Sequence, residues 1–182
     1  MDTPNGKEWI ESVSGINSQF FISLSSKEET MTLETTTTIM DKPVIHLRES
    51  ISILIAEDDQ GYYVLTKNCL RNAGLTNEIL WFEDGQATLD FFHGDAYGSN
   101  GKKYILLLDI RMPKIDGIQV LEKIRADARF EGVPIIMLTT SEDKELAKRC
   151  YELGCDAHII KPPGEVLLKA IRRVSQQYYH HL

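Results

Sequence analysis

The chain lacks most of the features that mark secreted and membrane proteins. It has only three cysteines, Cys69, Cys150 and Cys155, and none of them forms a CxxC pair. This small, odd number argues against a disulfide framework and fits reduced thiols in the cytoplasm. No apolar run approaches the ~20 residues of a transmembrane helix, and the N-terminus lacks the basic and apolar stretches of a secretory signal. We therefore expect a cytoplasmic protein that does not bind a membrane.

The sequence also lacks an excess of positive charge. Lys and Arg number 20 against 27 Asp and Glu, which gives a formal net charge of −7. Nucleic acid binds basic surfaces, so this charge predicts no direct nucleic-acid partner. The chain contains no GxxxxGK[ST] loop, and no GxGxxG follows its first apolar run. These absences argue against a nucleotide-binding site.

What is present is the composition of one folded domain behind an extension. The 182 residues are 42% apolar and 26% charged, close to the average for a globular protein. Residues 1–50 hold 14 Ser and Thr, with four basic and eight acidic side chains, which is typical of a mobile arm. We predict a largely mobile N-terminal extension over residues 1–48 and a domain over residues 49–182.

Two other interpretations of the extension stay open. Translation could begin at Met31 or Met40, which would remove much of it. Alternatively, its aromatic side chains, Trp9, Phe20 and Phe21, would dock on the domain.

From residue 51 onward, short apolar runs alternate with segments of helical periodicity. The expected strands are 51–56, 77–82, 104–108, 133–138 and 157–160. The expected helices are 63–73, 84–92, 116–128, 142–153 and 165–177. This alternation implies right-handed crossovers. It predicts an α/β fold, a doubly wound five-stranded parallel sheet with helices on both faces.

Polar side chains follow four of the five expected strands. They are Glu57, Asp58 and Asp59 after the first strand, Asp109 after the third, Thr139, Thr140 and Ser141 after the fourth, and Lys161 after the fifth. The carboxyl ends of parallel strands form the ligand-binding edge of such a sheet. Carboxylates gathered there would repel and raise one another's pKa. A hard oxygen-seeking cation resolves the repulsion, so the pattern predicts a Mg²⁺ site.

Each of these residues alone has an ordinary structural explanation. The acidic pair Glu57 and Asp58 could cap a helix, and Asp109 could form a turn. Thr139 could be a capping hydroxyl and Lys161 a solvated surface side chain. The argument rests on their occurrence together, on the first, third, fourth and fifth strands in that order.

Four segments resemble the receiver domains of two-component response regulators. They are Ile-Leu-Ile-Ala-Glu-Asp-Asp at 53–59, Leu-Leu-Asp-Ile-Arg-Met-Pro-Lys-Ile-Asp-Gly at 107–117, Pro-Ile-Ile-Met-Leu-Thr-Thr-Ser at 134–141, and Ile-Lys-Pro at 160–162. The resemblance covers residues 49–178 and implies a CheY-like, flavodoxin-like sheet with strand order 2-1-3-4-5. The helix at 87–92 and the Leu-Thr-Thr-Ser-Glu segment are similar to single-domain regulators associated with phytochrome-type kinases.

The resemblance also implies a role for each site residue. Asp109 would accept a phosphoryl group from a sensor histidine kinase, possible partners including a phytochrome-type kinase. Glu57, Asp58, Asp109 and the backbone carbonyl of Arg111 would hold Mg²⁺. Thr139 would hydrogen-bond the phosphoryl group, and Lys161 would pair with it.

One position departs from the family pattern. Receivers commonly have Tyr or Phe three residues before the lysine, where this chain has His158. His158 either fills the place of the aromatic ring or acts as a pH-sensitive switch. We predict that Thr139 and His158 switch the face formed by 142–153, 157–160 and 165–177, which could also form a homodimer.

Three classes of function fit these observations. The first is a stand-alone response regulator, not an enzyme, whose output passes through protein contacts because no segment for an output domain follows residue 182. The second is a binding module of the same fold that needs no phosphorylation. The third is a phosphatase or phosphotransferase with an aspartyl intermediate. Enzymes of the haloacid dehalogenase type place DxD after their first strand, whereas here Asp109 follows the third and position 111 is Arg.

Overall fold

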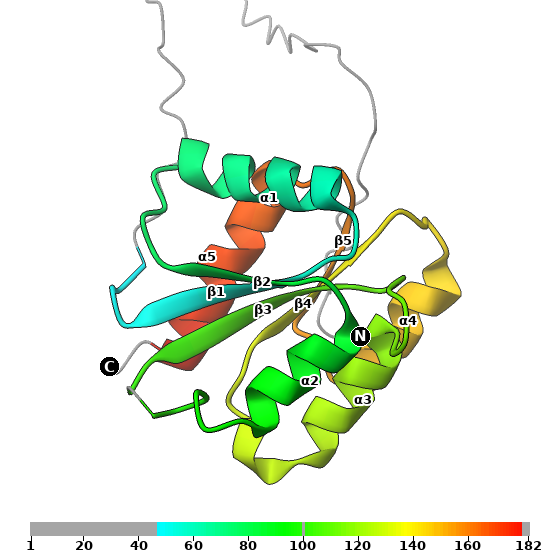
Figure 1. Cartoon of the computed structure of the whole chain (residues 1–182). Coiled ribbons are helices and arrows are strands. Elements are labelled where there is room, and N and C mark those ends of the chain that lie inside the picture. The colour runs from blue at the N-terminus through cyan, green and yellow to red at the C-terminus, as the bar shows by residue number, and fades with distance from the viewer. Residues whose placement is uncertain (1–46, 100, 180–182) are drawn as a thin grey trace, which may run out of the picture. The chain divides into compact units, whose positions relative to one another are not determined.

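A five-stranded, all-parallel sheet forms the middle layer of the computed structural model, which describes residues 47–99 and 101–179. Its strands are β1 (Ile51–Ala56), β2 (Ile79–Phe82), β3 (Lys103–Asp109), β4 (Ile135–Thr139) and β5 (Ala157–Ile160). They lie in the order β2-β1-β3-β4-β5, so the predicted doubly wound topology is confirmed (Figure 1). β1 and β3 are neighbours in the middle of the sheet, and the direction in which successive strands are added changes between them. Ligands of such sheets bind at this point, so the residues that follow β1 and β3 lie where a ligand is expected.

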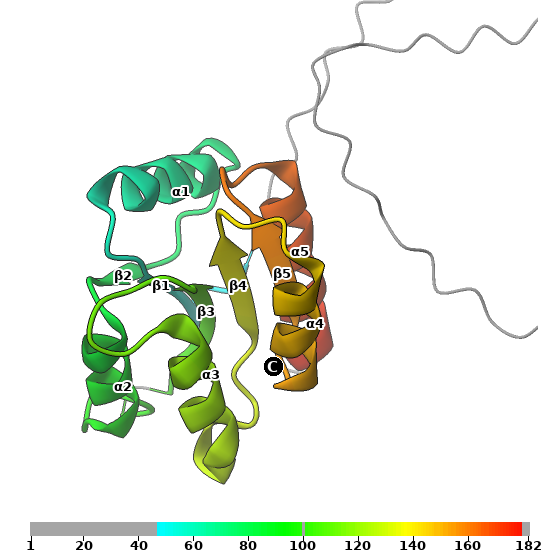
Figure 2. The same ribbon diagram turned by 90° about the vertical axis from the view of Figure 1, so that its right-hand side faces the viewer.

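Five helices cover the two faces of this sheet. They are α1 (Gln60–Asn72), α2 (Gly85–His93), α3 (Gly117–Ala126), α4 (Lys144–Glu152) and α5 (Glu165–Tyr179), with a 3-10 turn at Ala128–Phe130. α1 and α5 pack on one face, and α2, α3 and α4 on the other. Figure 2 shows α4 and α5 beside the edge strand β5. No helix in the described part of the chain is long and apolar enough to cross a membrane.

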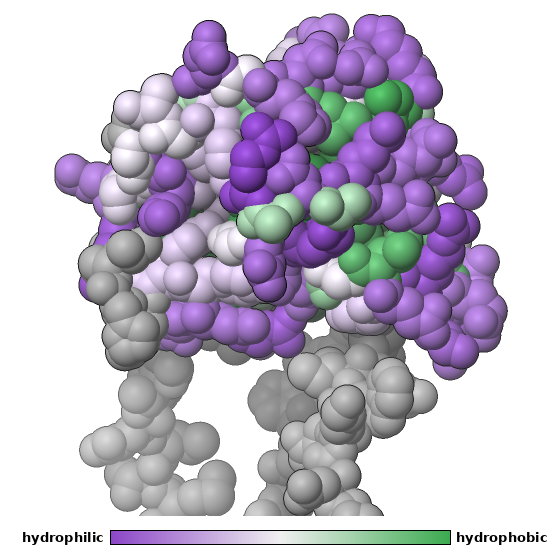
Figure 3. Space-filling view, turned by 90° about the horizontal axis from the view of Figure 1, so that it is seen from below, coloured by the Kyte–Doolittle hydropathy of each residue, from purple (hydrophilic) through white to green (hydrophobic). Residues whose placement is uncertain are grey.

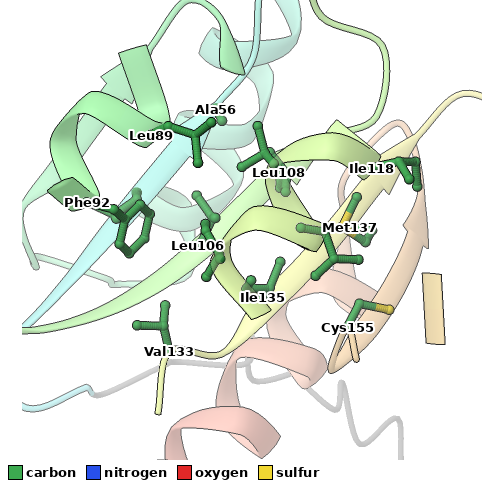
Figure 4. Packing of buried hydrophobic residues seen from close by; sticks show 14 of the residues in the cluster. Ala56, Leu89, Phe92, Leu106, Leu108, Ile118, Val133, Ile135, Met137 and Cys155 are labelled. Atoms are coloured by element: carbon green, nitrogen blue, oxygen red, sulfur yellow. The ribbon is translucent and has the colours of Figure 1, made fainter. Parts of the chain in front are cut away.

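The central strands are buried on both sides because their side chains alternate between two apolar clusters. Ile53 and Ile55 of β1 point toward α1 and α5, whereas Leu54 points toward α2 and α3. Leu106 and Leu108 of β3 join the second cluster, whose packing Figure 4 shows. Each fully buried aliphatic side chain contributes about 1.5–3 kcal/mol. This core gives the strand ends a rigid base.

Most elements begin within two residues of the predicted start, and hydrogen bonds explain the shifts of α1 and β2. α1 begins at Gln60, three residues before the expected start, because the carboxylate of Asp59 accepts a hydrogen bond from the Tyr62 N–H at 2.9 Å and caps the helix. β2 begins at Ile79 rather than residue 77, because the Asn77 amide donates to backbone carbonyls instead of continuing the strand. Asp59, the third acidic residue after the first expected strand, is therefore a helix cap.

The N-terminal extension predicted over residues 1–48 lies outside the described residues except for its last two. The same holds for the proposed docking of Trp9, Phe20 and Phe21.

The surface seen from below in Figure 1 is mainly hydrophilic, with small separate hydrophobic spots (Figure 3). This face therefore has no large apolar patch in that view.

Candidate functional site

Three carboxylates meet at the carboxyl edge of the sheet. Glu57 and Asp58 directly follow β1, and Asp109 is the last residue of β3. One oxygen from each lies within 4.8 Å of the others. Glu57 and Asp109 are buried, whereas Asp58 is exposed to solvent. The two central strands thus bring together the three side chains that the sequence predicts as ligands.

Lys161 reaches this cluster from the end of β5. Its Nζ lies 2.6 Å from Oε2 of Glu57 and 3.0 Å from Oδ1 of Asp109, and its side chain is almost fully buried. The backbone N–H of Lys161 also donates to the Thr139 carbonyl at 2.7 Å, so a hydrogen bond joins the ends of β4 and β5. One buried ammonium therefore faces two buried carboxylates, and it is not the solvated lysine of the simpler interpretation.

Burial shifts the acid strengths of this cluster. Burial raises the pKa of Glu57 to about 7; the Lys161 hydrogen bond opposes this rise, and the neighbouring Asp109 charge adds to it. Burial likewise raises the pKa of Asp109, against the attraction of Lys161. The sequence suggested that repulsion between the carboxylates would raise these pKa values. Repulsion contributes less to the rise than the loss of solvation on burial does.

The oxygens of the cluster fit a hard divalent cation. Oε1 of Glu57 is buried and has no hydrogen-bond partner among the described residues, although Oε2 pairs with Lys161. A buried carboxylate oxygen without a donor is costly. Mg²⁺ binds carboxylate oxygens while keeping several waters, and the exposed Asp58 leaves the site open to water. The carboxylate oxygens of the cluster are therefore suitable ligands for the predicted Mg²⁺.

The loop after β3 holds Asp109 and Arg111 in place. The backbone N–H groups of Ile110 and Arg111 lie beside the Asp109 carboxylate and work to lower its pKa, and the Ile110 N–H donates to the Leu138 carbonyl of β4 at 3.1 Å. The Gly117 N–H donates to the Ile110 carbonyl at 2.9 Å. A Cβ on Gly117 would lie 2.0 Å from the Asp109 carbonyl oxygen, so only glycine fits there. Arg111, whose carbonyl is the fourth predicted ligand, is thereby kept two residues beyond Asp109.

Thr139 is the last residue of β4 and is buried. Its Oγ1 accepts a hydrogen bond from the Ser141 N–H at 3.0 Å. An accepting hydroxyl still has its own proton to donate. Since β4 pairs with β3 through Asp109 and Leu138, the Thr139 hydroxyl sits at the same edge as the carboxylates.

His158 lies apart from the carboxylates, against α4. Its backbone N–H donates to the Tyr151 hydroxyl at 3.2 Å. The ring is half-buried, and its Nε2 has no hydrogen-bond partner within residues 47–99 and 101–179. Burial lowers the pKa of His158, which favours a neutral imidazole at neutral pH.

Two aromatic residues at this edge escaped sequence reasoning. The Tyr62 ring lies under the Lys161 ammonium, with Nζ 4.5 Å from the ring centroid. The Trp81 indole N–H donates to the Glu57 carbonyl at 2.8 Å. A helix start at Gln60 would have placed Tyr62 in its first turn, beside the strand ends. The Trp81 contact depends on the pairing register of β1 with β2, for which the sequence has no signal.

With this geometry in place, comparison with known proteins identifies the family. Residues 53–172 match the family model of the response regulator receiver domain. The chain therefore belongs to the receiver domains of response regulators, which act in two-component signalling.

Individual relatives are similar over most of their length. The probable methanogenesis regulatory protein FilR2 of Methanothrix harundinacea is 32% identical over 136 residues, covering 75% of this chain and 88% of that protein. Response regulator Rcp1 of Synechocystis is 28% identical over 110 residues, covering 60% and 75%. The bacteriophytochrome response regulator AtBRR is 30% identical with a TM-score of 0.60, covering 72% of this chain and 95% of that structure. The predicted resemblance to phytochrome-associated regulators is thus confirmed.

Proposed function

We propose that this protein is a phosphorylation-switched response regulator in which Asp109 accepts a phosphoryl group from a phosphohistidine of a sensor kinase. The observation that carries the proposal is the buried cluster in which Lys161 contacts both Glu57 and Asp109 while Oε1 of Glu57 is left without a donor. A binding module without phosphorylation would have no use for this costly arrangement of buried charges.

The transfer forms a bond between an Asp109 carboxylate oxygen and phosphorus and breaks the bond from phosphorus to the histidine nitrogen. The imidazole of the kinase keeps the electron pair and takes a proton from water. Lys161 already lies 3.0 Å from Asp109, and it pairs with the incoming phosphoryl oxygens. The Thr139 hydroxyl donates to one of them.

A bound Mg²⁺, held by Glu57, Asp58, Asp109 and the Arg111 carbonyl, would neutralise charge on the phosphoryl oxygens. Phosphoryl transfer of this kind depends on position and charge rather than on further covalent chemistry. The acceptor in each transfer is the protein's own Asp109 carboxylate, which ends the reaction phosphorylated. We therefore propose that the protein is not an enzyme in its own right.

We propose a phytochrome-type histidine kinase, acting in the cytoplasm, as the donor. Two bacteriophytochrome response regulators, AtBRR and RtBRR, share 30% and 31% of their residues with this chain at TM-scores of 0.60 and 0.59. The three cysteines, which form no disulfide, agree with a reducing compartment.

We further propose that output passes through the face formed by α4, β5 and α5. Each element presents one large exposed apolar side chain there: Tyr151 on α4, Ile160 on β5 and Val166 on α5. These side chains are suited to contact a partner or a second copy of the chain.

Labelling with acetyl phosphate tests the proposed function. The intact protein should gain the mass of one phosphoryl group only when Mg²⁺ is present. The Asp109→Asn variant should gain none, while Asp90→Asn, an exposed acid on α2, should label as the wild type does. A wild-type protein that stays unlabelled at saturating Mg²⁺ and acetyl phosphate would instead favour the binding module.

A further inference from the structure

Trp81 contacts the backbone of the first acidic residue. It lies on the edge strand β2, where it pairs with Ile55, and the last pair of the ladder is Ala56 with Phe82. Beyond that pair, the Glu57 N–H donates to the Phe82 carbonyl at 2.9 Å. The Glu57 carbonyl accepts from the Trp81 indole N–H at 2.8 Å. The Glu57 N–H is thus bonded to the backbone of β2, and the Glu57 carbonyl is bonded to a side chain of β2.

Few groups hold the Glu57 carboxylate directly. Oε1 has no hydrogen-bond partner among the described residues, and Oε2 pairs with the buried Nζ of Lys161. The backbone of Asp59, two residues further on, also faces the carboxylate. The direction in which this carboxylate points therefore depends on the orientation of the local backbone as well as on Lys161. The contact that fixes the Glu57 carbonyl acts indirectly on both carboxylate oxygens.

Trp81 is itself held by α1. Its ring stacks on Tyr63, with the ring centroids 4.4 Å apart and the planes 7° from parallel. The Tyr63 N–H in turn donates to the Asp59 carbonyl at 3.0 Å. Trp81 and Tyr63 thus connect the two ends of the acidic segment, Glu57 at the start and Asp59 at the end. Stacked aromatic pairs stabilise each other beyond the effect of the area they bury, so the stack holds the Trp81 ring in place.

We propose that Trp81 is a positioning residue of the metal site, which sets the orientation of Glu57 through its carbonyl and so raises the affinity for Mg²⁺. The inference rests on the proposed function, since it assumes that Glu57 binds the ion. Groups that orient ligands without touching the metal commonly change its affinity. Among the described residues no hydrogen bond joins Trp81 to Asp109, so we expect Trp81 to act on ion binding rather than on the phosphoryl acceptor.

The test is a calorimetric titration of the full-length chain with Mg²⁺. Trp81→Phe keeps an aromatic ring that can stack on Tyr63 but removes the indole N–H. We expect it to bind Mg²⁺ about fivefold more weakly, the equivalent of a hydrogen bond worth about 1 kcal/mol. Tyr97→Phe, a half-buried aromatic remote from the acidic segment, serves as the matched control and should bind as the wild type does.

A second readout separates positioning from general loosening. The Mg²⁺ concentration that gives half-maximal labelling by acetyl phosphate should rise about fivefold in Trp81→Phe, while the rate at saturating Mg²⁺ stays within about twofold. If the Phe variant fails to fold, as judged by circular dichroism, Trp81→Tyr replaces it, since it also lacks the indole N–H.

Three results would overturn the inference. Unchanged Mg²⁺ affinity in Trp81→Phe removes the role of Trp81 and leaves the proposed function intact. A loss of maximal labelling rate without a shift in Mg²⁺ dependence indicates a structural role alone. A wild-type protein that binds no Mg²⁺ contradicts the proposed site itself, and the inference falls with it.

Discussion

The ammonium of Lys161 lies 3.0 Å from a carboxylate oxygen of Asp109, and both side chains are almost fully buried. Lys161 follows the edge strand β5 and Asp109 ends the central strand β3, with β4 between them. The contact therefore reaches across three neighbouring strands and depends on the register in which β3, β4 and β5 pair. It brings a cation to the one carboxylate that, in our proposal, acquires further negative charge.

The close approach of Gly117 to Asp109 predicts a sensitive position. Gly117→Ala should push the β3–α3 loop away from Asp109, because the added Cβ would lie 2.0 Å from the Asp109 carbonyl oxygen. We expect a loss of about 1–3 kcal/mol in unfolding free energy, together with weaker Mg²⁺ binding. Gly132→Ala, whose Cβ would meet no atom within 4 Å, is the matched control. Equal stability of the two variants in urea denaturation would contradict this packing.

The raised pKa of Glu57 predicts how stability changes with pH. Because the native pKa is about 7 and the ordinary value is 4.5, the native state binds a proton more readily than the unfolded state between these pH values. The unfolding free energy of the metal-free protein should therefore fall as pH rises through this window. The raised pKa of Asp109 acts in the same direction.

His158 acts in the opposite direction, since its lowered pKa makes stability fall as the pH drops below about 6.5. The informative comparison is therefore wild type against Glu57→Gln, in EDTA, at pH 5.5 and 8. Glu57→Gln should gain stability relative to the wild type at pH 8 and much less at pH 5.5. A difference between the two proteins that does not change with pH would exclude Glu57 as the titrating group.

Asp156 predicts a stability effect that spares the site. Its Oδ2 accepts from the Ile135 N–H at 2.8 Å and from Arg125 at 3.1 Å, and its Oδ1 accepts from the Tyr178 hydroxyl at 2.6 Å. These contacts join α3, β4 and α5 at the amino edge of the sheet. Asp156→Ala should lower the unfolding free energy by about 3–5 kcal/mol, because it leaves Arg125 without its partly buried partner. Mg²⁺ affinity at a temperature where the variant is folded should stay unchanged; a weakened affinity would show that the two edges are coupled.

Phosphorylation should change the face formed by α4, β5 and α5. If the Thr139 hydroxyl moves toward the phosphoryl group, the hydrogen bond that it accepts from the Ser141 N–H at 3.0 Å is stretched, and the loop after β4 should move with it. We expect amide exchange between residues 139 and 175, including His158, to change on addition of beryllofluoride, a mimic of the phosphoryl group. Asp109→Asn should show no such change. Identical protection with and without beryllofluoride in the wild type would rule out a switch on this face.

The topology and the gathering of charges could be predicted because both follow from alternation. Apolar runs that alternate with helical segments require a parallel sheet, and a parallel sheet aligns the carboxyl ends of its strands. Alternation therefore places Glu57, Asp58, Asp109 and Lys161 at one edge, and the strand order that the family resemblance implies brings them close together. The positions of these residues at the ends of apolar runs are enough to predict the edge on which they lie, even though the sequence does not show where their side chains point.

The contacts that orient these groups could not be predicted, because they depend on register and capping. Asp59 seemed a further acid of the site, but its carboxylate caps α1. Trp81 reaches the Glu57 carbonyl only because β2 pairs with β1 in one particular register. Asp156 has no sequence signal that distinguishes it from a surface acid, although it accepts bonds from three elements.

The most direct test of the account is to map the phosphoryl group chemically. After labelling with acetyl phosphate and Mg²⁺, borohydride reduces an aspartyl phosphate to homoserine, which peptide mass spectrometry locates. The account predicts homoserine at position 109 alone, with none in a sample prepared without Mg²⁺. Homoserine at Asp58, at Asp59 or at any other aspartate, or a phosphoryl group carried by a different type of residue, would contradict it.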